Sequence, residues 1–162
     1  MLRMLTKKIK KYQYRKSTSF SVLKRVEYNN AEDAQKHSER LLKLKKDKFE
    51  GRIKVPYFEF EVEGPIMIIQ SEYIKGRPPL EHDMKHIYDV IVCRSNPWTF
   101  SDCSPSNFVV DTRHRDDKTN SAPIYSVDVD SYREINIETR KRLYQKAMDN
   151  FGGNWITFHP NI

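Results

Sequence analysis

The chain has 162 residues, enough for one domain or two small lobes with a buried core. Apolar residues make up 38% and charged residues 31%, and the 12% of aromatic residues argues against a disordered chain. The net charge of +7 is uneven, because residues 1–54 carry 17 Lys/Arg against 6 Asp/Glu while the rest carries 12 against 16. The basic first third predicts contact with a polyanion such as nucleic acid, an anionic surface or a nucleotide, or else a solvated basic face.

The cysteines and apolar runs indicate the compartment. Two lone cysteines with no Cys/His spacing of the zinc-binding kind are typical of a reducing environment. The longest apolar run, Ile66 to Ile69, is too short for a transmembrane helix, and the basic N-terminal stretch lacks the apolar core of a signal peptide. We therefore expect a cytoplasmic protein that does not enter a membrane.

The first part of the chain predicts the order strand, strand, helix, strand, strand. Aromatic and β-branched runs around a KSTS turn indicate a hairpin, and capping asparagines before an amphipathic stretch indicate a helix that Gly51 ends. The expected ranges are 10–28 for the hairpin, 29–51 for the helix, and 55–64 and 65–74 for the two further strands.

Lys24 lies within the second expected strand. The period of two puts it on the same face as the apolar residues Val22 and Val26. A lysine on a buried face needs an anionic partner. The alternative is a half-exposed face along which its aliphatic stem lies, with the ammonium group in water.

The second part of the chain follows a connector, KGRPP, at residues 75–79. We therefore expect two lobes, residues 1–75 and 76–162. In the second lobe the patterns predict helices at 81–92 and 137–150, the latter starting near Asn136, and strands at 108–110 and 124–130.

Three oxygen-bearing side chains surround the two short strands of the second lobe. Asp102 and Asn107 lie five residues apart in the loop TFSDCSPSN, and Asp128 comes at the end of the strand IYSVD. If the strands pair as a hairpin, Asn107 and Asp128 are neighbours at one end of it and Asp102 lies just before them. Oxygen ligands of this kind suit Mg²⁺. Taken singly, Asp102 and Asn107 also suit turn-capping roles, and Asp128 a surface acid.

These motifs resemble the protein-kinase-like fold in a reduced form, nearest to kinases of the aminoglycoside-phosphotransferase type. DCSPSN is similar to the catalytic loop, YSVDVD to the metal-binding strand end, SVLKRVEY to the strand with the phosphate-contacting lysine, and SEYIKGRPP to the hinge. The resemblance covers residues 10–135. It implies an α+β fold with a small antiparallel-sheet N-lobe carrying one helix, and a truncated helical C-lobe carrying a catalytic-loop hairpin.

The resemblance also implies a role for each matching residue. Asp102 would accept the proton of the attacking hydroxyl, and Asn107 with Asp128 would hold Mg²⁺ against the ATP phosphates. Lys24 would contact the α- and β-phosphates, with His37, Glu39 or Asp130 in support and Glu32 as an alternative acid. The backbone of Glu72, Tyr73 and Ile74 would bind the adenine. The implied function is transfer of the γ-phosphoryl group of ATP to a hydroxyl on a small molecule or protein.

The match departs from the family pattern in places. No glycine-rich loop precedes Lys24, since the first glycine is Gly51, and Phe100 stands where a histidine is usual. A catalytically inactive kinase-like module is therefore one alternative. A basic nucleic-acid-binding protein that uses residues 7–16, KKIKKYQYRK, is another. The reduced form suits a compact phage or viral genome.

Overall fold

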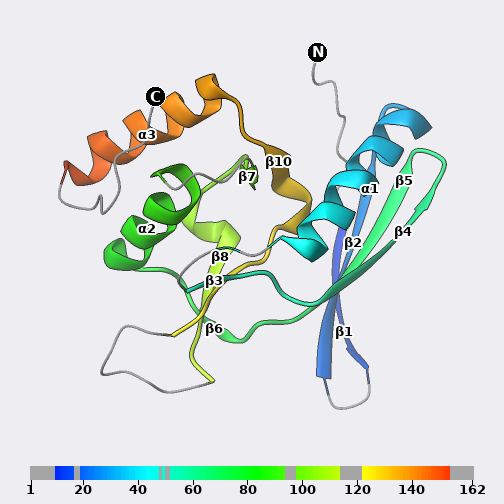
Figure 1. The fold of residues 1–162 in the computed structure, drawn as a ribbon. Helices are drawn as coiled ribbons and strands as arrows, with labels where there is room; N and C mark the ends of the chain where they lie inside the picture. Colours follow the sequence, from blue (N-terminus) through cyan, green and yellow to red (C-terminus); the bar gives the residue numbers. More distant parts are fainter. Residues whose placement is uncertain are drawn as a thin grey trace. The chain divides into compact units, whose positions relative to one another are not determined.

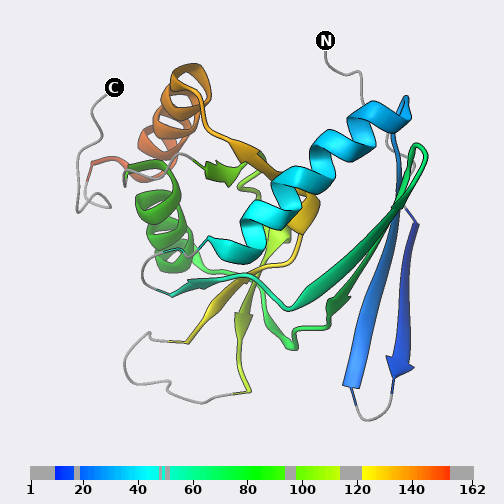
Figure 2. The same cartoon turned by 45° about the vertical axis from the view of Figure 1, so that its right-hand side comes forward.

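The computed structural model describes residues 10–16, 19–47, 49, 52–93, 98–113 and 122–153. Within these residues the chain forms α-helices and small, mostly antiparallel sheets, so the expected α+β class is confirmed (Figures 1 and 2). No helix in this described part is both long and apolar enough to cross a membrane.

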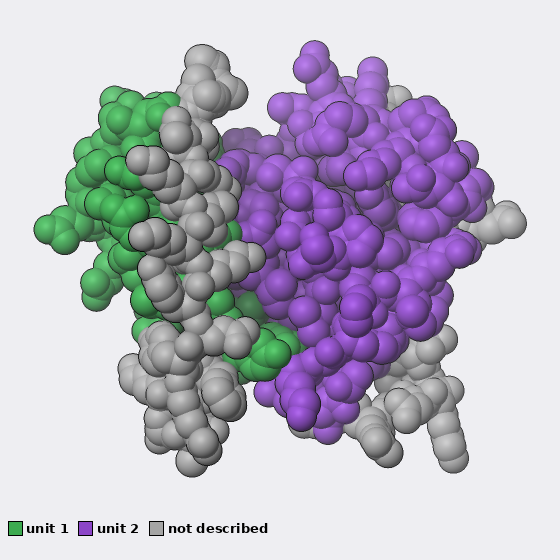
Figure 3. Space-filling model, turned by 180° about the vertical axis from the view of Figure 1, so that it is seen from behind, with its two compact units in different colours: residues 1–46, 56–74 green, residues 47–55, 75–162 purple. Residues whose placement is uncertain are grey.

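The chain divides into two compact units (Figure 3). Unit 1 holds residues 1–46 and 56–74, and unit 2 holds residues 47–55 and 75–162. The boundary after residue 74 is one residue from the expected boundary between the lobes. The segment 47–55 differs from that expectation, because it belongs to unit 2.

Unit 1 contains a four-stranded antiparallel sheet. The strands are β1 (Lys10–Lys16), β2 (Ser19–Glu27), β4 (Phe58–Glu63) and β5 (Ile66–Glu72), in the order β1-β2-β5-β4. The two expected hairpins are both present, with Lys10 opposite Arg25 in one and Glu63 opposite Ile66 in the other. Gly64 has φ of +58°, a conformation that glycine adopts without strain in the tight turn of the second hairpin.

One helix, α1 (Ala31–Lys46), packs against the sheet of unit 1. Its first turn is capped by the Oδ1 atom of Asn30, which accepts a hydrogen bond of 2.8 Å from the Asp33 amide. Its buried residues follow helical spacing and end at Leu44. The helix was expected to run to Gly51 but ends at Lys46. The chain leaves unit 1 at this point, because the segment that follows belongs to unit 2, where Ile53 is buried in a strand.

Unit 2 contains two sheets. One has the order β3-β9-β8-β6 and the other pairs β10 with β7. The strands are β3 (Ile53–Lys54), β6 (Gly76–Arg77), β7 (Trp98–Phe100), β8 (Phe108–Asp111), β9 (Ile124–Ser126) and β10 (Tyr132–Glu134). β3 runs parallel to β9, and this pairing is what joins segment 47–55 to unit 2.

The helices of unit 2 begin close to where the sequence predicts. α2 (Glu81–Tyr88) continues as a π-helical turn (Asp89–Cys93), and α3 (Ile137–Phe151) is capped by the Asn136 side chain, which accepts from the Thr139 amide at 2.8 Å. The expected strand 124–130 was too long. It ends at Ser126, because residues 129–131 form a 3₁₀ turn in which the Asp128 carbonyl accepts from the Ser131 amide and hydroxyl.

A buried carboxylate connects three elements of unit 2. Asp83 of α2 is fully buried and pairs with Arg52, just before β3, and with Arg77 of β6, each at 2.8 Å. The Leu80 amide donates a further hydrogen bond of 2.9 Å to it. Burial alone would raise the pKa of Asp83, but the hydrogen bonds and positive charges of these partners lower it below the usual aspartate value. The carboxylate therefore holds β3 and β6 against α2.

Gly76 is required by the close approach of β6 to β8. A Cβ atom at this position would lie 2.0 Å from the Val110 carbonyl oxygen, which is a backbone atom and has no rotamer to adopt. Gly76→Ala is therefore expected to lower the free energy of unfolding by about 2 kcal/mol. Denaturant unfolding followed by circular dichroism measures this change.

The matched control is Gly153→Ala. Its Cβ would meet nothing closer than 3.9 Å, so the expected change is below about 0.5 kcal/mol. Equal stabilities of the two variants would contradict the close approach of β6 and β8.

Candidate functional site

The loop between β7 and β8 is fixed at both ends. Phe100 at the end of β7 is fully buried, and the Ser101 amide donates to the Ser131 carbonyl at 2.9 Å. Pro105 then opens a 3₁₀ turn (Pro105–Asn107), where its fixed φ is compatible with the turn. Residues 101–104 lie between these two fixed points, so the backbone conformation of the loop is constrained at both ends.

Asp102 is exposed in this loop, and its carboxylate is oriented by Ser104. Its Oδ1 atom accepts hydrogen bonds from the Ser104 hydroxyl and from the Ser104 amide, the latter at 3.0 Å. The Ser104 hydroxyl is the largest cause of a pKa below the usual aspartate value. Asp102 therefore does cap the turn, as the simpler interpretation predicts, and at neutral pH it presents an ionised carboxylate in one orientation.

Asn107 links the loop to the following hairpin. Its Nδ2 atom donates to the Asp102 carbonyl oxygen at 3.1 Å, which directs the carboxamide oxygen away from that carbonyl. Its own backbone carbonyl accepts from the Val127 amide at 2.9 Å. Asn107 is thus tied both to the residue that carries the candidate base and to the chain just before Asp128.

Asp128 lies at the same end of the β8–β9 hairpin as Asn107. The strands pair Phe108 with Ser126, and the Asn107–Val127 hydrogen bond continues this register by one residue. Asp128 follows directly and is half-buried. Unit 2 therefore brings Asp102, Asn107 and Asp128 to one end of one hairpin. These carboxylate and carboxamide oxygens are the donor type that Mg²⁺ takes.

Other ionisable groups near this loop were not expected from the sequence. Lys146 of α3 contributes to the lowered pKa of Asp102, after the Ser104 hydrogen bonds and that of Asn107. Cys103 is buried with Sγ 3.6 Å from the Phe100 carbonyl, and burial raises its pKa to about 12. The thiol is therefore protonated at neutral pH. No motif points to Lys146, which lies on α3, and α3 packs on α2, where the Phe151 and Tyr88 rings are 5.9 Å apart.

Lys24 lies on the buried face of the unit 1 sheet, as the strand period predicts. It is 8% exposed and shares this face with Val26 and Tyr28. The ring of Tyr28 is 5.7 Å from that of His37, so this is the face that α1 covers. The sequence prediction of a buried lysine is confirmed, and the half-exposed alternative is wrong.

The supporting acids expected for Lys24 lie at different places. Glu39 is exposed on α1, and Glu32 is exposed and pairs with Lys36 at 3.6 Å. His37, which is buried against Tyr28, is the expected supporting residue of α1 that faces the sheet. Asp130 belongs to unit 2, where it is fully buried and its carbonyl accepts from Arg133 at 2.7 Å.

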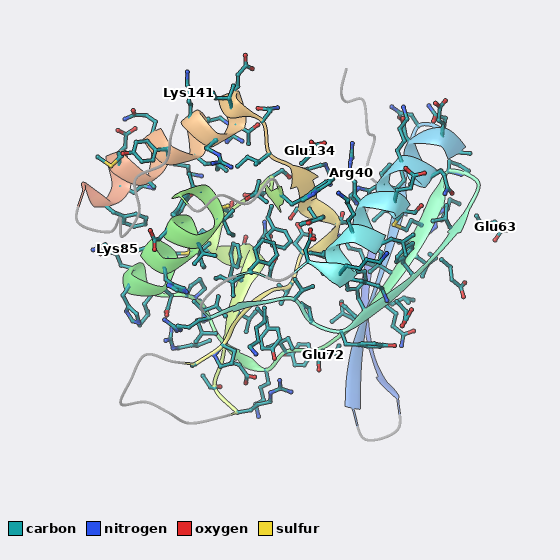
Figure 4. The ribbon with its side chains drawn as sticks, viewed as in Figure 1. Arg40, Glu63, Glu72, Lys85, Glu134 and Lys141 are labelled. Atoms are coloured by element: carbon teal, nitrogen blue, oxygen red, sulfur yellow. The ribbon has the colours of Figure 1, made fainter. Side chains whose placement is uncertain are left out.

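The expected hinge residues follow β5. The Glu72 amide donates to the Tyr57 carbonyl at 2.9 Å, so hydrogen bonds from this segment to a nucleotide base would come from the residues after it. Tyr73 is 41% exposed and Ile74 is buried. Figure 4 labels Glu72 at this end of β5.

The sequence-predicted residues fall in different units: Lys24 and residues 72–74 belong to unit 1, and Asp102, Asn107 and Asp128 belong to unit 2. Residues 7–9 of the basic segment lie outside the described residues, and 10–16 form β1. No group of three or more His, Cys, Asp or Glu side chains with metal-binding geometry occurs within the described ranges. No protein-family model matches the chain, and no curated protein matches its sequence.

Proposed function

We propose that this chain is a reduced kinase-like phosphotransferase that moves the γ-phosphoryl group of ATP to a hydroxyl acceptor. The observation that supports this most directly is the end of the β8–β9 hairpin, where the backbone register places Asp128 beside Asn107 and Asn107 bonds to Asp102. The Asn107 bond to the Asp102 carbonyl couples the candidate base to the candidate metal ligands. A reaction that needs the base and the metal ligands at fixed positions relative to each other would benefit from this hydrogen bond.

The residues divide the work of phosphoryl transfer between them. The ionised carboxylate of Asp102 accepts the proton of the acceptor hydroxyl while that oxygen bonds to the γ-phosphorus and the bond to the β-phosphate oxygen breaks. Asn107 and Asp128 are the residues that would hold Mg²⁺, which when bound neutralises phosphate charge. In this proposal Lys24 would contact the α- and β-phosphates, and the backbone after Glu72 would bind the adenine.

Titration with ATP and Mg²⁺ tests the proposal. The expected result is a Tm that rises with nucleotide concentration, because the nucleotide binds only the folded state. Product analysis should then find ADP and a phosphorylated hydroxyl compound. A rise in Tm without turnover favours the inactive kinase-like module. No change in Tm at millimolar ATP and Mg²⁺ contradicts nucleotide binding in both forms.

Lys24→Met tests whether the ammonium group of Lys24 itself binds the nucleotide, as distinct from the effect of the net charge of the chain. Methionine keeps the apolar stem on the covered face of β2 and removes a charge-assisted hydrogen bond to phosphate, so the Kd of Mg²⁺-ATP is expected to rise by about tenfold or more. Isothermal titration calorimetry measures this affinity.

The matched control is Lys46→Met, at an exposed position of the same unit. It removes the same formal charge and is expected to leave the Kd within about twofold. Equal Kd values for the two variants would remove Lys24 from the nucleotide site.

A further inference from the structure

The two edge strands of the unit 1 sheet differ in charge. Within the described residues, β1 and β4 each pair with another strand on one side only. β1 has the sequence KKYQYRK, with four basic residues and no acid, and β4 has FEFEVE, with three glutamates and no base. The sheet therefore has one basic edge and one acidic edge.

The geometry of the sheet allows these edges to meet in two copies of the chain. All neighbouring strands in the order β1-β2-β5-β4 are antiparallel, so β4 runs opposite to β1. β1 of a second copy can therefore lie beside β4 as an antiparallel neighbour while both sheets keep the same strand direction and the same face. This is a head-to-tail contact between two different edges.

The backbone of β4 offers hydrogen bonds on its open side. The Tyr57 carbonyl accepts from the Glu72 amide, and in an antiparallel ladder such pairs alternate along the strand. The amide and carbonyl groups of Phe58, Phe60 and Val62 therefore point to the open side. The Phe58 carbonyl already accepts from the Lys45 ammonium group at 2.5 Å, so Phe60 and Val62 are the residues that a new strand would meet.

The side chains of β4 add a charge preference. Its burial alternates, with the three glutamates exposed on the face opposite to α1. Glu61 and Glu63 line a shallow pocket of about 360 Å³ together with Ile66 and Ile68 of β5. Glu63 points outward from the end of β4 (Figure 4). A pocket with apolar and acidic walls fits lysine and tyrosine side chains, and β1 consists mainly of these residue types.

We propose that β4 of one copy pairs with β1 of a second copy and extends the antiparallel sheet of unit 1. Opposite charges on facing strands favour this pairing, whereas two β4 edges or two β1 edges repel each other. Because the contact joins different edges, each dimer keeps one free β1 edge and one free β4 edge. Association therefore continues with concentration rather than stopping at a dimer.

Sedimentation velocity over a range of protein and salt concentrations tests this inference on the full chain. The weight-average sedimentation coefficient is expected to rise with protein concentration at low salt and to fall toward the monomer value as salt screens the edge charges. A monomer at all concentrations up to several hundred micromolar would overturn the proposal.

Charge reversal on either edge identifies the contact. Glu61→Lys with Glu63→Lys, or Lys10→Glu with Lys16→Glu, is expected to raise the dissociation constant by about tenfold or more. An equimolar mixture of the two double variants should associate again, because the unchanged β1 of the β4 variant can pair with the unchanged β4 of the β1 variant.

The control for net charge is Glu32→Lys with Glu39→Lys on the exposed face of α1, which changes the charge of the chain as much as the β4 variant does. It is expected to leave association within about twofold of the wild type. Association that ignores the edge variants, or a mixture that fails to associate, would overturn the proposal.

Val62→Pro tests the backbone independently of charge, because it removes an amide that points to the open side and leaves the β4–β5 ladder intact. It is expected to abolish association while circular dichroism shows the same fold. A labelled oligonucleotide is the last probe. Association that requires nucleic acid, and that the β4 variants leave unchanged, would assign β1 to nucleic acid and overturn the pairing.

Discussion

Turnover of ATP is expected to fall by about 10²- to 10⁴-fold when Asp102 is replaced by asparagine, with the free energy of unfolding unchanged. The carboxamide oxygen of asparagine can still accept the Ser104 hydrogen bonds that orient the loop, so the turn is kept. What disappears is the negative charge and the capacity to take a proton. A coupled assay of ADP release measures the rate, and denaturant unfolding measures the stability.

The matched control for this variant is Asp149→Asn. Asp149 is exposed on α3 in the same unit and accepts a hydrogen bond of 2.8 Å from Gln145. It loses the same charge away from the loop, so turnover is expected to stay within about twofold. Wild-type turnover in the Asp102 variant would contradict the role of Asp102 as the base. If the variant loses turnover because it unfolds, Asp102 has only the role of capping the turn.

Local patterns in the sequence predicted the elements that local forces fix. The hairpin at 10–28 follows from strand composition on both sides of a short turn, and the starts of α1 and α3 follow from Asn30 and Asn136 as capping residues. The burial of Lys24 follows from the period of two along β2. Each of these signals lies within a few residues of the feature that it predicts.

The short strands of unit 2 could not be predicted in this way. β3 and β6 have two residues each, too few to display a period, and β3 pairs with β9 from about seventy residues further along the chain. The same non-local pairing moved segment 47–55 into unit 2. Gly76 was expected only as part of the connector 75–79, and its close approach to the Val110 carbonyl is visible only in the structure.

The sequence predicted which residues form the candidate site, but it did not predict the hydrogen bonds between them. The spacing of Asp102 and Asn107 suggested a shared loop, and the hairpin supplied the neighbourhood of Asp128. The bond from the Asn107 side chain to the Asp102 carbonyl depends on the 3₁₀ turn between them, which Pro105 begins. Lys146 depends on helix packing, so no motif could assign it.

Asp83→Asn is expected to lower the free energy of unfolding by about 3 kcal/mol at pH 7, because it leaves Arg52 and Arg77 without their shared carboxylate in a buried site. Arg77 is the more exposed of the two and recovers part of its hydration, which keeps the loss at the lower end of the usual range for buried pairs. Urea unfolding followed by tryptophan fluorescence measures the difference. Glu81→Gln is the control, since Glu81 is exposed and pairs with Lys85 one turn away, and a change below about 0.5 kcal/mol is expected there.

The pH dependence of this loss gives the sharper test of the network. The pKa of Asp83 is lowered in the folded state, so its contribution to stability is fully present above the unfolded aspartate value of about 3.9 and is lost as pH falls through the folded pKa. The difference in the free energy of unfolding between wild type and Asp83→Asn should therefore stay constant from pH 7 to pH 5 and shrink below pH 4. A gap that stays constant through the acid range would mean that the carboxylate charge does not hold β3 and β6 to α2.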